Sequence, residues 1–412
     1  MTYSYVHRDI EPILKELITQ FPALVITGPR QSGKSTLLKR IFGAEYKYHT
    51  FDDPLTREKA LADPLLFLED GNSKLIIDEI QHVPELLSYI KLAIDKNRNK
   101  RGRFILTGSQ QFALMKNLAD TLAGRIAVLE LLPFSINEKK KILSEKKYND
   151  SKNYFIDGLL RGSFPELVKN HDIASKFWYG SYIQTYLERD IRTLYNIGDL
   201  RDFQRLLHLL AARAAQLLNL SELARDLGVA VNTVKKWVSI LEASRIITLL
   251  KPYYKNFGKR MVKSPKVYFL DCGLLCYLLS ISSEEDIFDG PFKGALFENF
   301  CVQETMKHFI NSGLIPELYF VRTHDGLGID LLLERSGALY PIEFKCTKTV
   351  KMSMIYPIEI FRKWSPKPEI NKGAIVSLSD TSPNKEQIAQ NILALDMDVY
   401  LAWLKRNFKF YS

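Results

Sequence analysis

The sequence is poor in cysteine, and its few cysteines are not spaced as metal ligands. The four among its 412 residues form no CxxC pair and have no matching pair of histidines: Cys272, Cys276, Cys301 and Cys346. This pattern argues against a structural zinc site and against a disulfide-stabilised secreted protein. We expect the cysteines to act as small apolar residues in hydrophobic cores.

Long apolar segments are also missing. No run of about 18 apolar residues is present, and the opening residues MTYSYVHRDIEP lack the apolar stretch of a signal peptide. Internal repeats and low-complexity tracts are absent as well. We therefore expect a cytoplasmic protein with no membrane partner.

What the sequence does contain is typical of several folded domains. Hydrophobic residues make up 46% and charged residues 25% of the chain, close to globular averages, and its length corresponds to roughly two to four domains. Fifty-seven Lys and Arg residues against 47 Asp and Glu residues give a formal charge of +10. This surplus favours a phosphate-bearing partner such as nucleic acid, although it serves plain solubility equally well.

Short apolar runs alternate with helical patterns in the first third of the chain. An amphipathic helix is expected over residues 8–21, and strands are expected at residues 23–27, 74–77, 104–107 and 127–132. Strands that alternate with helices favour a mostly parallel sheet covered on both faces.

A phosphate-binding loop follows the first of these strands. Residues 28–35, GPRQSGKS, match G-x-x-x-x-G-K-S/T between a predicted strand and a predicted helix. In such a loop the glycines let backbone N–H groups converge on phosphate oxygens, the lysine adds charge and the serine offers its hydroxyl to Mg²⁺. A simple glycine-containing turn is the alternative. The predicted ATP contacts are Gly28, Pro29, Arg30, Gln31, Ser32, Gly33, Lys34, Ser35 and Thr36.

Two carboxylates end the strand predicted at residues 74–77. Asp78 would bind Mg²⁺ together with Ser35, and Glu79 would orient and deprotonate the attacking water. An acidic pair after a strand also occurs as a helix N-cap, but the preceding phosphate loop favours the catalytic interpretation.

Two more positions are candidates for contact with the γ-phosphate. Ser109, with Thr107 as second choice, follows the next strand and offers a hydroxyl, although such hydroxyls often cap helices. Arg125 precedes the strand after that, where it would either reach the nucleotide of a neighbouring subunit or lie on the surface as an ordinary arginine. The predicted catalytic residues are therefore Lys34, Glu79, Ser109 and Arg125.

The middle of the chain is predicted to be helical. A lysine-rich stretch at residues 138–147 is expected to be a solvated helix or linker, and a helical segment spans residues 154–195. Three compact helices are predicted next, at residues 203–217, 221–227 and 231–243, with Ser221 as the N-cap of the second. Strands at residues 246–254 and 266–270 would flank a basic wing.

In a helix-turn-helix the last of these three helices lies in the DNA major groove. It offers side chains that can contact bases and phosphates: Asn232, Thr233, Lys235 and Lys236. Two alternatives remain open: a plain helical core with solvated lysines, or a winged helix that contacts a protein.

The last part of the chain predicts a second α/β unit, with strands at residues 318–321, 329–334, 339–344 and 373–378. Asp330 and Glu343 would lie on adjacent strands of a hairpin, with Lys345 on the same face as Glu343 because side chains alternate. Two carboxylates and a lysine so placed suit metal-dependent hydrolysis of phosphodiesters. A retained scaffold used only for contacts is the alternative.

These motifs together resemble prokaryotic AAA-type ATPases whose C-terminal half is a domain of unknown function. Besides the phosphate loop, the resemblance rests on FDDP at 51–54, DEIQ at 78–81, LTGS at 106–109, LAGR at 122–125, GSFPE at 162–166, YLERDI at 186–191 and GALFEN at 294–299. It implies an α/β fold: a P-loop NTPase (AAA+) parallel sheet with a helical lid, a winged helix-turn-helix and a restriction-endonuclease-like, PD-(D/E)xK α/β domain. The implied boundaries are residues 1–140, 141–199, 200–285 and 286–412.

The same resemblance adds Glu298, on the helix before the predicted hairpin, to the nuclease-like set of Asp330, Glu343 and Lys345. Members of the family often have Glu two positions before the metal-binding Asp, where this chain has Gly328. Neither the oligomeric state nor a role of Arg125 in a neighbouring subunit follows from the motifs.

Three functions fit these features. The first is an ATPase, with ATP and Mg²⁺ as cofactors, that couples nucleotide turnover to DNA binding or processing. The second is a nucleotide-controlled signalling switch whose C-terminal half binds a protein partner. The third is a metal-dependent DNA nuclease that ATP licenses.

Overall fold

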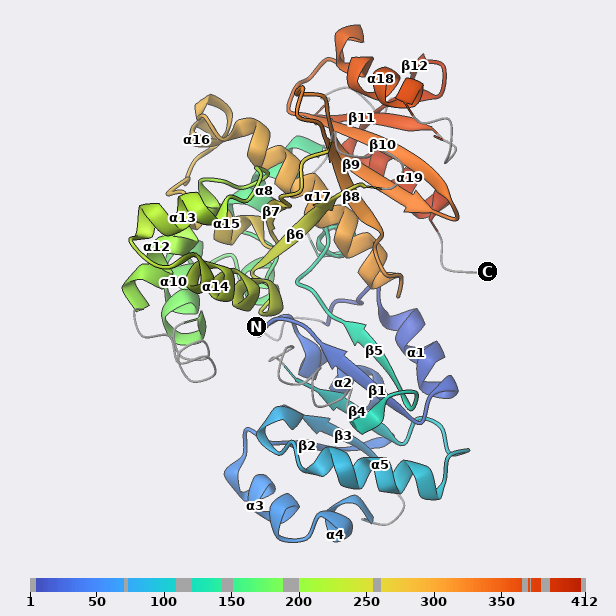
Figure 1. Ribbon diagram of the computed structural model, residues 1–412. Helices are drawn as coiled ribbons and strands as arrows, with labels where there is room; N and C mark the ends of the chain where they lie inside the picture. Colours follow the sequence, from blue (N-terminus) through green and yellow to red (C-terminus); the bar gives the residue numbers. More distant parts are fainter. Residues whose placement is uncertain are drawn as a thin grey trace.

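Two β-sheets organise the chain. The structure is a computed structural model that describes residues 5–69, 73–108, 121–142, 151–187, 200–254, 261–364, 370, 372–378 and 386–408. Within these residues the strands form a five-stranded sheet in the first third of the chain and an eight-stranded sheet in the remainder (Figure 1). No helix in the described ranges is long and apolar enough to cross a bilayer.

The first sheet is parallel, with the strand order β2-β3-β4-β1-β5. Its strands are β1 (Ala23–Thr27), β2 (Tyr46–Thr50), β3 (Lys74–Asp78), β4 (Phe104–Thr107) and β5 (Ile126–Glu130). Four of them match the predicted apolar runs. Strand β2 was not predicted, because this edge strand reads YKYHT and buries only Tyr46 fully, so no apolar run marks it.

Helices cover both faces of this sheet (Figure 1). Alternate residues of β1 enter different cores: Ala23 and Val25 on one face, Leu24 and Ile26 on the other. The helices on the Leu24 face are α1 (Glu11–Gln20) and α2 (Lys34–Phe42), and those on the Val25 face are α3 (Pro54–Ala62), α4 (Pro64–Glu69) and α5 (Leu86–Lys96). The 3₁₀ turn η2 (Ile80–His82) follows β3.

The lysine-rich segment begins with helix α7 (Ile136–Lys140), and the prediction that it is solvated was wrong there. Glu138 and Lys139 are 0% and 3% exposed. Glu138 forms a buried ion pair with Arg8, and Lys139 pairs with Asp157 and donates a hydrogen bond to the Gly162 carbonyl at 2.9 Å. Arg8 lies 130 residues before Glu138, and Asp157 lies outside the lysine-rich segment. The local charge pattern therefore does not reveal this burial.

Helices dominate the middle of the chain, on the left in Figure 1. They are α8 (Ser151–Leu160), α9 (Pro165–Lys169), α10 (Ser175–Tyr182), the π-helical turn η3 (Ile183–Leu187), α12 (Leu200–Ala211), α13 (Leu220–Leu227), α14 (Val231–Ala243), α15 (Cys272–Leu278) and α16 (Glu284–Asp289). Helices α12 to α14 lie where the three helices were predicted, although α12 ends at Ala211 and the prediction extended it to residue 217. The N-cap of α13 is Asn219 and not Ser221, because the Asn219 side chain accepts the Glu222 backbone N–H.

The second sheet is mixed, in the order β12-β13-β11-β10-β9-β8-β6-β7. Its strands are β6 (Ile247–Pro252), β7 (Lys266–Phe269), β8 (Leu318–Arg322), β9 (Gly328–Arg335), β10 (Ala338–Lys345), β11 (Gly373–Ser377), β12 (Glu386–Ala389) and β13 (Ile392–Asp396). The β6–β7 hairpin, whose connecting loop was predicted as the wing, is joined to this sheet by the parallel pairing of β6 with β8. The hairpin and the C-terminal strands thus belong to one continuous β-sheet.

Helix α17 (Lys293–Asn311) lies between the helical region and the second sheet (Figure 1). The remaining elements are η5 (Met352–Ile355), α18 (Tyr356–Trp364) and α19 (Met397–Asn407). One cluster of buried apolar side chains extends from Ile136 to Phe408 and includes residues of α8, α12, α17 and α19. Cys272, Cys276 and Cys301 are buried, as expected, and Cys346 is half-buried.

Candidate functional site

The loop between β1 and α2 has the backbone that a phosphate site needs. Gly28 and Gly33 have φ angles of 137° and 95°, in the region that favours glycine. A Cβ atom on Gly28 would lie 2.2 Å from the Leu131 carbonyl oxygen, so no side chain fits there. Gly33 precedes the first turn of α2, where backbone N–H groups have no partners within the helix. The loop therefore presents backbone donors to an anion at a helix N-terminus.

Lys34 extends over this loop. It is 5% exposed, and its Nζ donates hydrogen bonds to the carbonyls of Gly28 and Pro29, both at 3.0 Å. Burial lowers the pKa of Lys34, while Glu79 and Asp78 oppose that shift. The charge of Lys34 thus interacts with both acids of the predicted site. Among the other predicted ATP contacts, Gln31 and Thr36 are exposed.

Asp78, at the end of β3, is surrounded by hydroxyl groups. Ser35 Oγ donates to Asp78 Oδ2 at 2.7 Å, and Tyr48 and Thr107 also donate their hydroxyls to this carboxylate. These partners are neutral, so they orient the carboxylate without cancelling its charge. Mg²⁺ in nucleotide sites takes oxygen ligands, with one or two from protein and the rest from phosphate and water. Ser35 and Asp78 fit that requirement.

Glu79 adopts a left-handed backbone conformation, with φ at 57°. This is uncommon for a residue other than glycine and is found at functional sites where the surrounding structure enforces it. Its backbone N–H donates to Thr107 Oγ1 at 3.4 Å, and its carboxylate accepts from the Gln81 side chain. Thr107 therefore contacts both acids, whereas Ser109, the preferred residue from sequence, lies outside the described residues.

Sequence reasoning missed Arg8, which is 5% exposed beside the phosphate loop. Its guanidinium donates to the carbonyls of Ser32 and Leu132, at 2.9 and 2.7 Å, and pairs with Glu138 at 2.8 Å. These contacts connect the loop to the segment after β5. No signal in the sequence marks Arg8, because the groups that its guanidinium contacts lie 24 or more residues away.

Arg125 lies on the surface in an ion pair with Asp95 of α5. Its Nε and Nη2 are 2.8 and 3.0 Å from the two Asp95 carboxylate oxygens. The hydrogen bond from Arg125 lowers the pKa of Asp95. The structure thus places Arg125 against its own chain, on the α5 side of the sheet.

Helix α14 carries the predicted DNA contacts on its outer side. Asn232, Lys235 and Lys236 are exposed and Thr233 is half-buried. The opposite side packs into the core through Val234, Trp237, Val238, Ile240 and Leu241. Of the predicted wing, residues 255–260 lie outside the described part of the chain.

Two sets of contacts join the first sheet to the rest of the molecule. Arg245, just after α14, donates from Nη2 to Glu130 Oε2 at 2.8 Å, and Glu130 is the last residue of β5. Near α7, the Ile136 N–H donates to Glu304 of α17 at 2.8 Å, and Lys307 Nζ donates to the Phe134 carbonyl at 2.9 Å. The strand beside the phosphate-loop strand is therefore tied directly to the end of α14.

The structure also brings together the four predicted nuclease-like residues. Asp330 on β9 and Glu343 on β10 are neighbours, with the Asp330 N–H donating to Glu343 Oε1 at 3.3 Å. Lys345 Nζ is 2.6 Å from Glu343 and 3.4 Å from Asp330. Glu298 of α17 faces the same cluster through two residues that sequence reasoning missed, Lys266 and Tyr268 of β7, at 2.7 and 2.6 Å. We call these six residues the carboxylate centre.

Burial shapes the electrostatics of the carboxylate centre. Burial and the nearby Asp330 carboxylate raise the pKa of Glu343 to about 8 and also raise the pKa of Glu298. Burial disfavours the ammonium of Lys345, but Asp330 and Glu343 outweigh it and raise the pKa of that lysine.

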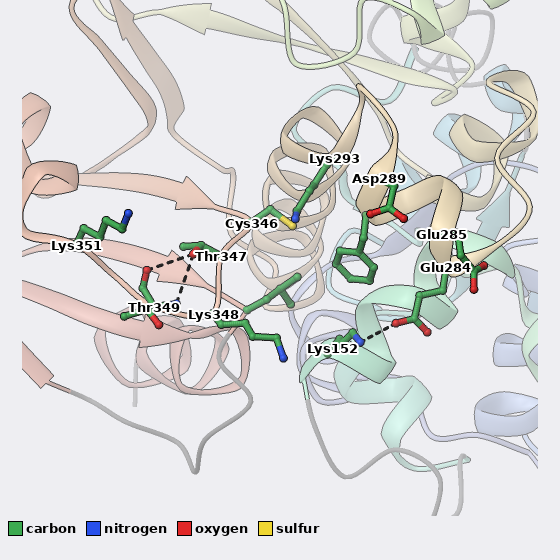
Figure 2. Close-up of a pocket in the computed structure, with 12 residues that line it drawn as sticks. Lys152, Glu284, Glu285, Asp289, Lys293, Cys346, Thr347, Lys348, Thr349 and Lys351 are labelled. Carbon is green, nitrogen blue, oxygen red and sulfur yellow. Dashed lines mark hydrogen bonds and ion pairs between the residues drawn. The ribbon is translucent and has the colours of Figure 1, made fainter.

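A pocket of about 700 Å³ lies where α8, α16 and α17 meet the segment after β10 (Figure 2). Lysines and acids both line it, and Lys152 forms an ion pair with Glu284 at 2.6 Å. The lining contains none of the residues predicted for ATP, DNA or the nuclease-like set. None of the predicted site residues therefore lines this cavity, although Cys346 directly follows Lys345 of the carboxylate centre.

Comparison with known families gives three consecutive matches. An AAA domain matches residues 20–140, a domain of unknown function (DUF8612) matches residues 152–285, and a second domain of unknown function (DUF4143) matches residues 293–396. The uncharacterized protein Rv2008c of Mycobacterium tuberculosis is 32% identical over 352 residues, which cover 84% of this chain and 75% of that protein. The uncharacterized protein MJ1544 of Methanocaldococcus jannaschii is 24% identical over 328 residues, covering 73% of this chain and 69% of that protein.

Solved structures of low sequence identity also superpose in part. The Thermotoga maritima RuvB Holliday junction branch migration motor matches 60% of this chain and 90% of its own, at 19% identity and a TM-score of 0.31. The Aeropyrum pernix ORC1 protein in complex with DNA matches 69% of this chain and 94% of its own, at 14% identity and a TM-score of 0.28. Because these scores are low, assignment to a family rests on the sequence matches.

Proposed function

The chain belongs to the same family as Rv2008c and contains the AAA domain of a nucleotide-binding ATPase, and on this premise we propose that it hydrolyses ATP and that turnover controls contact between helix α14 and DNA. The observation that supports hydrolysis best is the 2.7 Å hydrogen bond from Ser35 to Asp78. It joins the phosphate loop to the acid at the end of β3, as a site for a phosphate-bound cation requires.

Each residue of the nucleotide site has a distinct role in this proposal. Backbone N–H groups of the loop and the ammonium of Lys34 bind the phosphates. Ser35 and Asp78 would hold Mg²⁺, which neutralises charge on the phosphates when it is bound. Glu79 accepts a proton from the attacking water, while Thr107 fixes the position of both acids through its contacts with Asp78 and the Glu79 N–H.

Substitution of Lys34 tests nucleotide binding. We expect Lys34→Ala to lose binding of a fluorescent ATP analogue and to release no phosphate from ATP above background, because the variant lacks the lysine charge with which a phosphate loop binds the β- and γ-phosphates. Lys15→Ala, at an exposed position of α1, is the matched control and should behave as wild type. Phosphate release by Lys34→Ala at the wild-type rate would refute the proposed ATPase site.

The DNA part of the proposal is supported by the outer surface of α14 and by its connection to the first sheet. Asn232, Lys235 and Lys236 are exposed on one side of this helix, where lysines can neutralise phosphates. The Arg245–Glu130 ion pair ties the second residue after α14 to the end of β5, and β5 pairs along its length with the strand that leads into the phosphate loop. A change at the nucleotide can therefore reach α14 through few contacts.

A salt titration of DNA binding tests this part. A protein that neutralises phosphates loses affinity as salt rises, with a log–log slope of about −0.9 per phosphate. We expect the double variant Lys235→Ala/Lys236→Ala to bind more weakly and to reduce the magnitude of the slope by up to about 2. The control is Lys405→Ala/Arg406→Ala on the exposed side of α19. A flat salt response of the wild type would refute DNA contact and favour the protein-binding switch.

A further inference from the structure

The carboxylate centre contains a lysine that comes from outside the predicted nuclease-like set. Lys266 lies at the start of β7, and its backbone is fixed on both sides, paired with Leu250 of β6 and in an antiparallel bridge with Leu217. Tyr268, two residues later, points to the same face because strand side chains alternate. The β6–β7 hairpin therefore delivers both side chains to Glu298 in a defined register.

Each carboxylate of the centre faces an ammonium group. Lys266 Nζ is 2.7 Å from Glu298 Oε1 and 4.0 Å from Asp330 Oδ1. On the other side, Lys345 Nζ is 2.6 Å from Glu343 Oε2 and 3.4 Å from Asp330 Oδ2. The side chains of Lys266, Glu298 and Asp330 are 12%, 15% and 19% exposed, so water screens these pairs only partly.

Backbone donors occupy further lone pairs of the same carboxylates. The Phe344 N–H donates to Asp330 Oδ2 at 3.0 Å, and the Asp330 N–H donates to Glu343 Oε1 at 3.3 Å. Tyr268 donates its hydroxyl to the same Glu298 oxygen that Lys266 contacts. Both oxygens of Glu343, Asp330 Oδ2 and Glu298 Oε1 are therefore already engaged by donors of the protein.

The residues present do not fit a divalent cation. Mg²⁺ requires near-octahedral oxygen ligands at about 2.0–2.1 Å, and an ammonium held against the same oxygens competes for them and repels the ion. In the part of the chain that the structure describes, no three His, Cys, Asp or Glu side chains are grouped so that they could hold a metal ion. The metal implied by the resemblance to nucleases thus disagrees with the chemistry of this centre.

We propose that the ammonium of Lys266 takes the place of a divalent cation in the carboxylate centre, so that the centre fastens the β6–β7 hairpin to α17 and the C-terminal strands. The charges of the centre agree with this role. Two lysine ammonium groups face three carboxyl groups, and Glu343 is a weak acid because it is buried. The positive charge of the lysines therefore nearly balances the negative charge of the acids. The centre then acts as a structural ion network and does not cleave phosphodiesters through a metal.

Binding of Mn²⁺ to the nucleotide-free, full-length protein tests the proposal, with free Mn²⁺ measured by electron paramagnetic resonance. Wild type and Asp330→Asn should bind the same number of ions, because any ion bound elsewhere is common to both. Lys266→Met should gain one site, and Lys266→Met/Asp330→Asn should lose it again. Lys266→Arg, which keeps the positive charge, should gain none.

Two results would overturn the proposal. One is a Mn²⁺ site in the wild type that disappears in Asp330→Asn, or cleavage of plasmid DNA with Mn²⁺ that disappears in the same variant. The other is a folded Lys266→Met protein that gains no site. If Lys266→Met does not fold, Lys266→Gln replaces it. The comparison of wild type with Asp330→Asn needs no substitution at Lys266, so it tests the proposal in either case.

Discussion

The nucleotide site and the carboxylate centre both gather acids from strands, with Glu298 of α17 added in the carboxylate centre, yet they differ in what surrounds those acids. Asp78 is 4% exposed and Glu343 is 2% exposed, so burial does not distinguish them. The partners of Asp78 are the hydroxyls of Ser35, Tyr48 and Thr107. The partners of Glu298, Asp330 and Glu343 include the ammonium groups of Lys266 and Lys345.

The difference teaches that neighbours, more than burial, decide what a buried acid can do. Hydroxyls orient a carboxylate and leave its charge available to a cation that arrives with a nucleotide. Ammonium groups satisfy the charge within the protein, and the acids then hold elements together. Lys34 agrees with this rule. Its ammonium group donates its hydrogen bonds to carbonyls of the loop and not to Asp78, so it does not occupy the oxygens of that carboxylate.

The largest effect is expected at Glu79. Loss of a general base reduces turnover by about 10²- to 10⁴-fold, so Glu79→Gln should bind ATP as wild type does but release phosphate at least about 100-fold more slowly. Asp330→Asn, in the other centre, should leave phosphate release unchanged. The exposed Glu85→Gln is the matched control. If Glu79→Gln hydrolyses ATP normally, the general base is another residue. Glu79 could then no longer be contrasted, as a catalytic acid, with the structural acids of the carboxylate centre.

Stability should respond most strongly at Lys266. Removal of one partner of a buried ion pair costs about 3–5 kcal/mol, because it leaves an uncompensated charge, and Lys266→Met would leave Glu298 without its cation. Chemical unfolding should show this loss, and Mn²⁺ should restore part of it. Lys266→Arg keeps the charge and should lose less. A Lys266→Met protein as stable as wild type would show that the ammonium does not neutralise the centre.

The raised pKa of Glu343 predicts a pH dependence. The folded protein keeps the proton of Glu343 up to about pH 8, whereas an unfolded chain releases it near its ordinary value of 4.5. This stabilising contribution is therefore complete below pH 4.5 and is lost as the pH rises through about 8, with a slope of at most about 1.4 kcal/mol per pH unit.

Urea unfolding at pH 5, 6, 7 and 8 measures that slope. Glu343→Gln carries no titrating carboxyl at this position and should flatten the curve, whereas the exposed Glu359→Gln on α18 should not. An identical slope in wild type and Glu343→Gln would mean that other groups cause the pH dependence, and the electrostatic contrast between the two centres would lose its support.

The sequence predicted much of the fold because apolar runs and helical periods are local signals. Four strands of the first sheet and helices α12 to α14 follow directly from them. The edge strand β2 was missed because it is polar, and the burial of α7 was missed because Glu138 is neutralised by Arg8, 130 residues away. The joining of the β6–β7 hairpin to the second sheet depends on pairing with β8, which no local pattern encodes.

For the candidate sites, the motifs located the acids but not their neighbours. Residues 28–35 and Asp78 could be found because their spacing is itself the signal. Tyr48, Arg8 and Lys266 could not, since each reaches its site from a separate segment of the chain. For the carboxylate centre this matters most, because Lys266 changes the chemical interpretation of the four residues that the sequence did identify.

The smallest expected effect comes from a matched pair of tyrosines. Tyr48→Phe and Tyr268→Phe each remove one hydroxyl donor, from Asp78 and Glu298 respectively, and keep the ring. Other partners remain at both acids, so each change should cost about 1 kcal/mol of stability. Phosphate release should separate them: Tyr48→Phe should slow it about 5-fold, the rate equivalent of about 1 kcal/mol, and Tyr268→Phe should not change it. Equal slowing in both variants would mean that the carboxylate centre contributes to ATP hydrolysis, which a purely structural ion network cannot do.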